Sequence, residues 1–561
     1  MDNLRLILWA GFFVLLWLSV NQWSADYGVP SPPSPAPTQT NDAPTQTNNN
    51  TKEAPGVLGL SDKLPVIAIE NGPADMSEKP RLSTRLVTVK TDVFELGINP
   101  DKGGDIVQAK LLKYFPNKDD TSKNIELLSY NEDNYQYFQT GLLSLSGHPE
   151  PNHQQAFLEK DKKLELREGQ EQISTSLVWG IKQDQTNLEV KKSYTFQRGR
   201  YDILLTYDIK NLGTQDYTFV LYNQLVKKDV KEERSMFNVE TYSYNGPIIY
   251  NGESYQKIDT NELAGSPLRE THTNGWASNI QHHFLVAMVP EQNQPYAFSA
   301  SSDPANELYK VAMVGQTPVT VRPGARAQVS TTLVVGPKIQ EQLKDVAQGL
   351  ELSVDFGVLA FLSAPLFWVL ERVHRLVQNW GVAIILVTLL IKLLFYPLTE
   401  ASGKSMAKMR KVTPRIKAIQ DRHKDDKQAQ SQAMMELYKK EKVNPMAGCL
   451  PMLIQIPFFI AFYWVLLESV EIRQAPFFLW IQDLSSRDPY FVLPLIMGLG
   501  MFFQQKLNPA PPDPMQAKVM MAMPIMFTGM FAFFPSGLVL YWLTNSLLSI
   551  AQQWKINRAT Q

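Results

Sequence analysis

The sequence predicts a polytopic α-helical membrane protein with six transmembrane helices that carries one exported all-β domain. Long apolar runs are concentrated after residue 350, whereas residues 81–336 alternate apolar and polar side chains over short segments. The two parts also differ in charge. Residues 351–561 hold 21 Lys and Arg against 14 Asp and Glu, a net of +7, and the rest holds 33 against 41, a net of −8. These differences exclude a single globular domain.

Residues 1–23 are predicted to form an N-terminal signal-anchor helix. An apolar run over residues 4–20, broken only by Arg5, is just long enough to span a bilayer. A cleaved signal peptide is the alternative. The flank 21–25 has no clean small-x-small cleavage site and contains Trp23, which suits a membrane interface, so a retained anchor is favoured.

Two segments with different textures follow the anchor. Residues 24–60 are rich in Pro, Thr, Gln and Asn and have no apolar surface to bury, so they are predicted to be a disordered linker outside the membrane. We assign residues 61–340 to the β domain. Runs such as 188–196 and 201–209 alternate and are rich in β-branched and aromatic residues, which indicates a large antiparallel sandwich.

Five segments after residue 350 are long and apolar enough, or nearly so, for transmembrane helices. We assign these helices to residues 380–397, 449–468, 489–505, 517–534 and 537–553.

The ambiguous segment 353–379 is apolar for about 15 residues and then becomes polar. The loop 398–446 holds 12 Lys and Arg against 6 Asp and Glu, which places it in the cytoplasm. If 353–379 also crossed the membrane, this basic loop would face outward. We therefore predict an amphipathic interfacial helix, interrupted at Pro365. Both termini are then cytoplasmic and the β domain is exported.

The basic loop 398–446 is predicted to be a helical hairpin. Lys404, Lys408 and Lys411 recur at helical spacing, and Arg415 continues the same stretch. A face resting on anionic lipid accounts for this charge as well as a docking role does. The short C-terminal tail 554–561 has two basic residues and gives weak support for ribosome binding.

Lys392 lies inside the apolar run 380–397. A lysine near the bilayer centre costs about 2.5–3.5 kcal/mol, and less if it snorkels to the headgroups. Snorkelling is the simpler reading. Thr388, one turn earlier on the same helical face, extends a polar stripe deeper and favours a wet cavity. Because no acidic residue lies in the interior of any predicted span, the pattern points to a transient anionic partner.

Other predicted spans also carry polar side chains. Gln455 lies between Pro451 and Pro457, and either a structural interhelical hydrogen bond or a role in a polar site explains it. Near the outer end of the last span, ordinary interfacial aromatics are a strong alternative to a functional role. The polar tips there belong to Tyr541, Trp542, Thr544 and Asn545.

Catalytic and cofactor motifs are not found in the sequence. Gly403-Lys404-Ser405 looks like the end of a phosphate loop, but the first glycine of that motif would fall on Leu398. Cys449 is the single cysteine of the sequence, which excludes a disulfide framework and a Cys-based zinc site. The adjacent histidines His282 and His283 have no nearby carboxylate at the spacing of a metal site. We therefore expect no enzyme, no cofactor and no metal. We also expect no nucleic-acid binding, since the positive charge is confined to one stretch.

Several motifs over about residues 353–555 resemble the YidC family of membrane protein insertases in order and spacing. The N-terminal anchor, the Pro-rich linker and the β domain resemble its Gram-negative members. The motifs are NWG at 379–381, the Lys392 helix ending in YPLT at 396–399, NPMAGCLP at 444–451, LIQIP at 453–457 and FPSGLVLY at 534–541.

The resemblance implies an insertase and folding chaperone of the bacterial inner membrane that acts alone or with the Sec translocon. Five core spans would enclose a hydrophilic groove whose positive charge is Lys392, with Thr388 and Gln455 beside it. Tyr541 and Trp542 on the last helix would contact the substrate. Many family members carry Arg at the position of Lys392, and Lys lacks the bidentate fork.

The resemblance also implies that the cytoplasmic hairpin engages the substrate first and that the exported domain is a periplasmic β-supersandwich. The implied partners are nascent membrane proteins, the Sec translocon, the ribosome and membrane lipids. Two alternatives stay open: a small-anion transporter that uses Lys392, and a membrane-anchored carbohydrate-binding β domain.

Overall fold

The computed structural model describes residues 85–560 apart from short internal stretches. The predicted anchor 1–23, the linker 24–60 and the first residues assigned to the β domain lie outside the described residues. The internal stretches that are not described are 119, 132–133, 148–149, 181–186, 231–242, 264–265, 424–425, 442–449 and 508–513.

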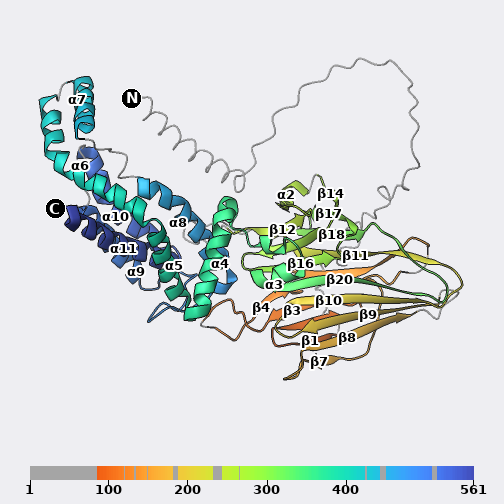
Figure 1. The fold of residues 1–561 in the computed structure, drawn as a ribbon. Coiled ribbons are helices and arrows are strands. Elements are labelled where there is room, and N and C mark those ends of the chain that lie inside the picture. The colour runs from red at the N-terminus through yellow and green to blue at the C-terminus, as the bar shows by residue number, and fades with distance from the viewer. Residues whose placement is uncertain are drawn as a thin grey trace, which may run out of the picture. The chain divides into compact units, whose positions relative to one another are not determined.

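The strands form two sheets, and the first of them has the order β14-β17-β18-β11-β5-β3-β2-β1-β7 (Figure 1). In addition, β19 pairs with β11 and β4 pairs with β3. Its strands are β1 (Val87–Lys90), β2 (Phe94–Asn99), β3 (Asp105–Leu111), β4 (Ile125–Leu128), β5 (Gln136–Ser144), β7 (Lys163–Glu165), β11 (Tyr217–Lys228), β14 (Leu268–Thr273), β17 (Pro295–Asp303), β18 (Leu308–Gly315) and β19 (Val319–Val321).

The second sheet has the order β13-β12-β15-β16-β20-β10-β9-β8-β6. Its pairings are antiparallel, with Leu205 of β10 opposite Tyr194 of β9. Its strands are β6 (Leu158–Glu159), β8 (Gln172–Gly180), β9 (Leu188–Gln197), β10 (Asp202–Asn211), β12 (Asn245–Tyr250), β13 (Tyr255–Lys257), β15 (Trp276–Gln281), β16 (Phe284–Pro290) and β20 (Arg326–Pro337).

The core of the β domain lies between the two sheets. Every second residue of β9 and of β10 is buried, as the alternation in the sequence predicts. Phe94, Phe138, Phe196 and Phe219 from both sheets are buried together. A second apolar cluster packs the short helix α3 (Gln340–Val346) and the 3₁₀ helix η4 (Leu350–Ser353) against the strands β12, β15 and β16.

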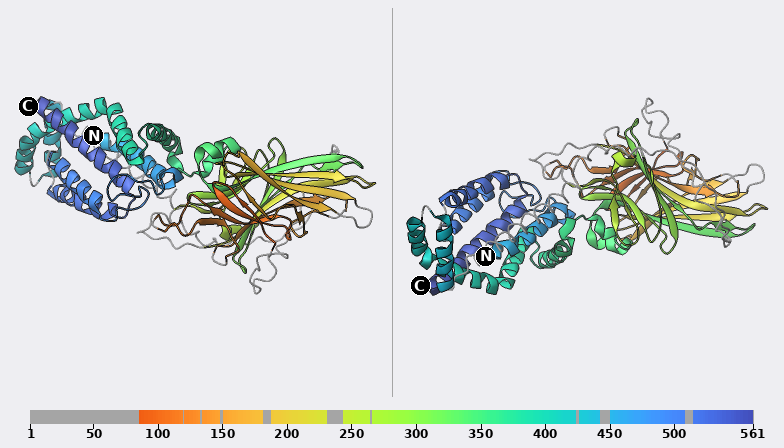
Figure 2. Two further views of the ribbon diagram at one scale, coloured as in Figure 1. Left: turned by 90° about the horizontal axis from the view of Figure 1, so that it is seen from below. Right: turned by 90° about the horizontal axis from the view of Figure 1, so that it is seen from above.

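The remaining helices pack with one another from α4 onward (Figures 1 and 2). The short helix α2 (Thr260–Leu263) belongs to the β domain, and η5 (Gly357–Leu359) and η7 (Val470–Ile472) are single 3₁₀ turns. The long helices are α4 (Ala360–Val377), α5 (Trp380–Leu394), α6 (Tyr396–Arg422), α7 (Lys427–Lys440), α8 (Leu450–Glu468), α9 (Val492–Leu507), α10 (Pro514–Phe531) and α11 (Ser536–Thr560).

One helical run within the described part of the chain, Gly357–Val377, is by itself long and apolar enough to cross a membrane. This is the segment that the charge pattern assigns to the interface, and the assignment stays a prediction because length and composition do not separate the two cases. Shorter apolar helices are Leu453–Glu468, Val492–Leu507 and Lys518–Phe531. The count of six spans also stays a prediction.

The predicted span 380–397 is broken rather than continuous. Trp380–Leu394 and Tyr396–Met409 meet at an angle of 66°. The cause is Pro397, which lacks an N–H and whose ring would clash with the carbonyl four residues earlier in a continuous helix. As a result, Pro397 occupies the first turn of α6, the position where proline is tolerated.

Local contacts fix the other ends of these helices. The Asn379 side chain caps α5 by accepting a hydrogen bond from Val382 N at 3.0 Å. The last helix, α11, continues to Thr560, so most of the predicted tail 554–561 is helical. Ile556 is buried there against Gly403 of α6, where a Cβ atom would lie 2.7 Å from its side chain. This packing explains why the helix continues.

A buried ion pair connects the β domain to the end of α8. Lys338 Nζ lies 3.2 Å from Glu468 Oε2, and both side chains are almost fully buried. Ser243 Oγ donates to Glu468 Oε1 at 2.7 Å, and His282 Nε2 lies 2.9 Å from Leu467 O. The segment after strand β20 is therefore tied to the C-terminal end of α8, the helix that carries Gln455.

Candidate functional site

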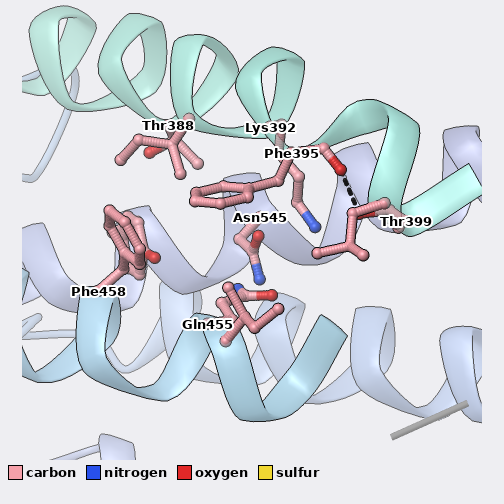
Figure 3. Close-up of a pocket in the computed structure, with 11 residues that line it drawn as sticks. Thr388, Lys392, Phe395, Thr399, Gln455, Phe458 and Asn545 are labelled. Atoms are coloured by element: carbon pink, nitrogen blue, oxygen red, sulfur yellow. Dashed lines mark hydrogen bonds between the residues drawn. The ribbon is translucent and has the colours of Figure 1, made fainter. Parts of the chain in front are cut away.

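A pocket lies where α5, α8, α11 and the start of α6 meet (Figure 3). It leaves about 470 Å³ of empty space, part of it open to solvent. Apolar and polar side chains alternate around it. The lining residues are Thr388, Ile391, Lys392, Phe395, Leu398, Thr399, Ile454, Gln455, Phe458, Tyr541 and Asn545.

Lys392 is the cation of this pocket. It lies in the last turn of α5, just before the break, and its amine points toward the space between Asn545, Gln455 and Thr399 (Figure 3). Lys392 Nζ donates to Ser549 Oγ at 2.8 Å. No carboxylate among the described residues lines the pocket. A positive charge in a membrane segment with a neutral partner is available to an anionic group.

Thr388 lines the pocket one turn deeper than Lys392 and is buried. Its Oγ1 donates to Ile384 O at 2.6 Å, so its single proton is used within its own helix. The Thr388 hydroxyl therefore has no proton left to donate, and toward a group in the pocket it can act only as a hydrogen-bond acceptor.

The structure separates the two aromatic residues predicted on the last helix. Tyr541 lines the pocket with Gln455 and stacks on Phe462, with ring centroids 4.6 Å apart. Trp542 is not among the lining residues. It packs edge-on against Phe459 at 4.9 Å and joins an aromatic cluster with side chains of α10. Tyr541 thus faces the pocket, and Trp542 packs between helices.

On the α11 wall of the pocket, the sequence analysis named Tyr541 as a substrate contact, but it did not assign Asn545 to the site and did not single out Ser549. Asn545 lines the pocket, and Ser549 holds the lysine ammonium. The signal was present, because Tyr541, Asn545 and Ser549 are spaced four residues apart and lie on one helical face. The bend also adds Phe395 and Thr399, whose Oγ1 donates to Phe395 O at 2.9 Å (Figure 3).

The four predicted docking residues lie outside the pocket, on α6. Lys404, Lys408, Lys411 and Arg415 are all exposed and share one helical face. Lys404 pairs with Glu400 at 2.8 Å and Arg415 with Glu441 at 2.6 Å. Exposed ion pairs of this kind are weak, and the four side chains are exposed, so the stripe remains accessible to an anionic surface.

Across the described part of the chain, no three His, Cys, Asp or Glu side chains are grouped as they would be around a metal ion. The rings of His282 and His283 stack with centroids 3.7 Å apart. Burial holds the pKa of His283 well below its usual value, so this imidazole is neutral.

Comparison with known proteins gives two matching family models. One, described as "60Kd inner membrane protein", matches residues 372–561, and the other, described as "YidC periplasmic domain", matches residues 86–369.

Individual relatives match over the full chain. A protein of Pseudomonas putida strain W619 named "Membrane protein insertase YidC" is 42% identical over 562 residues, which cover 100% of this chain and 98% of the relative. A protein of the same name from Pseudomonas entomophila strain L48 is 41% identical over 564 residues, with 100% and 99% covered.

Among solved structures, one described as "Active YidC insertase crystal structure with the first transmembrane domain resolved" has 19% identity and a TM-score of 0.37. The alignment covers 84% of this chain and 92% of that chain. The family assignment rests on the sequence matches.

Proposed function

Since this chain belongs to the YidC family of membrane protein insertases, we propose that the pocket around Lys392 is the groove that receives the polar part of a newly made membrane protein. The protein is an insertase of the inner membrane with a periplasmic domain, and it is not an enzyme. The observation that carries the proposal is the placement of Lys392, a cation that faces a polar pocket with no carboxylate among the described lining residues.

The physical task of the groove is to lower the barrier for moving a polar tail across the membrane. That barrier comes mainly from stripping water from polar and charged groups. Thr388, Gln455 and Asn545 offer hydrogen bonds in place of some of that water. Lys392 attracts a carboxylate more strongly than it would in bulk water, because the local dielectric is lower. The membrane potential adds about 2.3 kcal/mol per acidic charge per 100 mV in the outward direction.

We propose that Tyr541 is the α11 residue that contacts the substrate in this groove. Trp542 would act indirectly, because its ring packs on Phe459 and so supports the contact between α11 and α8 beside the groove. The apolar part of the substrate then leaves the groove laterally into lipid, so no covalent bond is made or broken.

For topology, we propose six spans, five of them forming the insertase core, with both termini in the cytoplasm. The 12 basic against 6 acidic residues of loop 398–446 support this orientation. An interfacial position for α4 is supported by its exposed Phe361, Trp368 and Leu376, together with Arg372, whose guanidinium lies 5.6 Å from the Trp368 ring.

For partners, we propose that the basic stripe on α6, consisting of Lys404, Lys408, Lys411 and Arg415, docks the incoming chain or its delivery machinery. Nascent membrane proteins are the substrates that the family membership gives. The Sec translocon, the ribosome and anionic lipid are proposed additional partners, supported by the exposed positive charge of the hairpin.

The proposed function can be tested by complementing a depleted strain with Lys392→Ala, Lys392→Arg and Lys392→Glu. Lys392→Arg should keep activity because the charge is kept. Lys392→Glu should lose insertion of reporters with acidic exported tails, since two negative charges would share the groove. Lys506→Glu reverses a lysine outside the pocket, at the end of α9, and is the matched control.

If Lys392→Glu inserted acidic-tailed reporters as well as the parent protein, the electrostatic groove would be wrong. Reporters with basic tails sharpen the result, because Lys392→Glu should handle them at least as well as the parent.

A further inference from the structure

A two-bond chain on the α11 side fixes the Lys392 ammonium. Lys392 Nζ donates to Ser549 Oγ at 2.8 Å, and Ser549 Oγ donates to Asn545 O at 2.7 Å. A serine hydroxyl has one proton and two acceptor sites. Because its proton is used on the Asn545 carbonyl, Ser549 meets the ammonium only as an acceptor. The direction of both bonds is therefore set.

These two hydrogen bonds oppose the tendency of a membrane lysine to extend its amine toward the lipid headgroups. A lysine near the end of a helix extends its flexible stem toward the nearest headgroups. Lys392 lies in the last turn of α5, where that escape route is short. The bond to Ser549 draws the amine toward α11, which packs against α5. The charge thus stays at the pocket.

The bond leaves most of the ammonium available. A lysine ammonium has three N–H donors, and Ser549 accepts from one of them. The hydroxyl is neutral, so it orients the positive charge without cancelling it. Gln455 and Asn545 lie beside the amine (Figure 3) and can complete the coordination of a small anionic group.

We propose that Ser549 is a positioning residue that presents the Lys392 ammonium to the carboxylate of an Asp or Glu in the segment being translocated. This inference rests on the proposed function of Lys392. Arginine holds its donors in a rigid planar fork, whereas lysine is a point charge on a flexible stem. Ser549 gives this lysine a fixed orientation, so acidic tails are recognised by the pair and not by the charge alone.

The test uses proteoliposomes that contain the full-length protein and two single-span reporters, whose tails differ only by one Asp or Asn. Ser549→Ala should slow insertion of the Asp reporter about 3- to 10-fold, the loss expected for one ordinary hydrogen bond, and leave the Asn reporter unchanged. Ser549→Thr should restore the rate, because threonine keeps a hydroxyl that bonds to the carbonyl four residues earlier.

Two further variants separate positioning from packing. Ser549→Ala should have no additional effect in a Lys392→Ala background, because no ammonium remains to be positioned. Ser546→Ala makes the same chemical change on the same helix, where Ser546 lies against Gly500 of α9, and should leave both reporters unchanged.

The outcomes distinguish the positioning role of Ser549 from the proposed role of the Lys392 charge in the groove. If Ser549→Ala slows both reporters equally, slows the Asp reporter further without Lys392, or has no effect while Lys392→Ala does, the positioning role is overturned and the groove charge stands. If Lys392→Ala inserts the Asp reporter at the parental rate, the proposed function fails, and this inference fails with it.

Discussion

Two lysines, Lys192 in the β domain and Lys392 in the helical region, lie where burial disfavours a positive charge, and their surroundings differ. Lys192 of β9 is completely buried between the sheets. Its Nζ donates to Gly103 O at 2.8 Å and to Gly104 O at 3.3 Å, and the rings of Tyr194 and Tyr207 lie 5.4 and 5.5 Å away. Lys392 has one hydroxyl partner and faces a pocket.

The difference shows which buried charges are structural. Burial lowers the pKa of Lys192 to about 7, and the negative charge of Asp105 offsets part of that effect. Two carbonyls and a nearby carboxyl group surround the Lys192 amine, so it has little left to offer a ligand. Within the described part of the chain, one hydrogen bond engages the Lys392 ammonium, which leaves N–H donors for the pocket side. Availability of donors, more than depth of burial, marks the lysine that can act on a substrate.

The largest expected effect is on stability, from Lys192→Met. Removing the amine takes the Lys192 counter-charge away from the buried Asp105 and leaves Gly103 O without this donor, while Asp105 keeps its bond from Gln139 and Gly104 O keeps its bond from Tyr194. The loss of the counter-charge should destabilise the β domain by about 3–5 kcal/mol. Limited proteolysis and denaturant unfolding of the purified protein measure this. Lys191→Met changes the exposed neighbour on the same strand and should have almost no effect. Equal unfolding midpoints for the two variants would mean that the lysine is not structural.

Lys338 should behave like Lys192, since it is also buried, and its ammonium is paired with the Glu468 carboxylate. Glu468→Gln leaves its ammonium without a counter-charge and should lower the unfolding free energy by about 2–5 kcal/mol. The double variant Lys338→Met with Glu468→Leu should recover much of the loss. If Glu468→Gln were as stable as the parent protein, the Lys338–Glu468 ion pair would not stabilise the fold.

Glu471 is an intermediate case, because its Oε2 is buried and has no hydrogen-bond partner among the described residues. Burial raises the pKa of its carboxyl to about 7, against 4.5 in the unfolded chain. Between these values the folded state holds a proton that the unfolded state has lost. The stabilisation is therefore complete below pH 4.5 and is lost as the pH rises through 7, by at most about 1.4 kcal/mol per pH unit.

Glu471→Gln is uncharged at every pH and should flatten this dependence. Melting temperatures of the two proteins between pH 5 and 8 make the comparison. Parallel curves would show that the carboxyl is ionised throughout.

The smallest effect on stability is expected for Lys392→Met. Among the described residues its hydrogen-bond partner is Ser549, which keeps its own bond to Asn545 O, so the change should shift the unfolding free energy by less than about 1 kcal/mol. Insertion of acidic tails should nevertheless fall strongly. A large loss of stability without a loss of insertion would reverse the contrast with Lys192.

Local patterns predicted much of this structure. The alternation over residues 188–196 places Lys192 on the inward face of its strand, and the apolar run around Lys392 placed Thr388 one turn away on the same helical face. The family resemblance, and not the local pattern, placed Gln455 beside Lys392. The long-range partners of the lysines were not predictable. Gly103 is 89 residues from Lys192 and Glu468 is 130 residues from Lys338, and neither pairing leaves a periodic signal in the sequence. The same holds for Ser549, which is 157 residues from Lys392.

The bend between α5 and α6 has a mechanical consequence. Phe395 lies at the joint, and Leu398 and Thr399 lie beyond it, yet all three line the same pocket as Lys392. The joint is thus an elbow whose one arm is an apolar helix and whose other arm is the start of the basic hairpin. A tilt of the hairpin about this joint would move one wall of the pocket relative to the lysine, so a load on the hairpin would change the width of the opening.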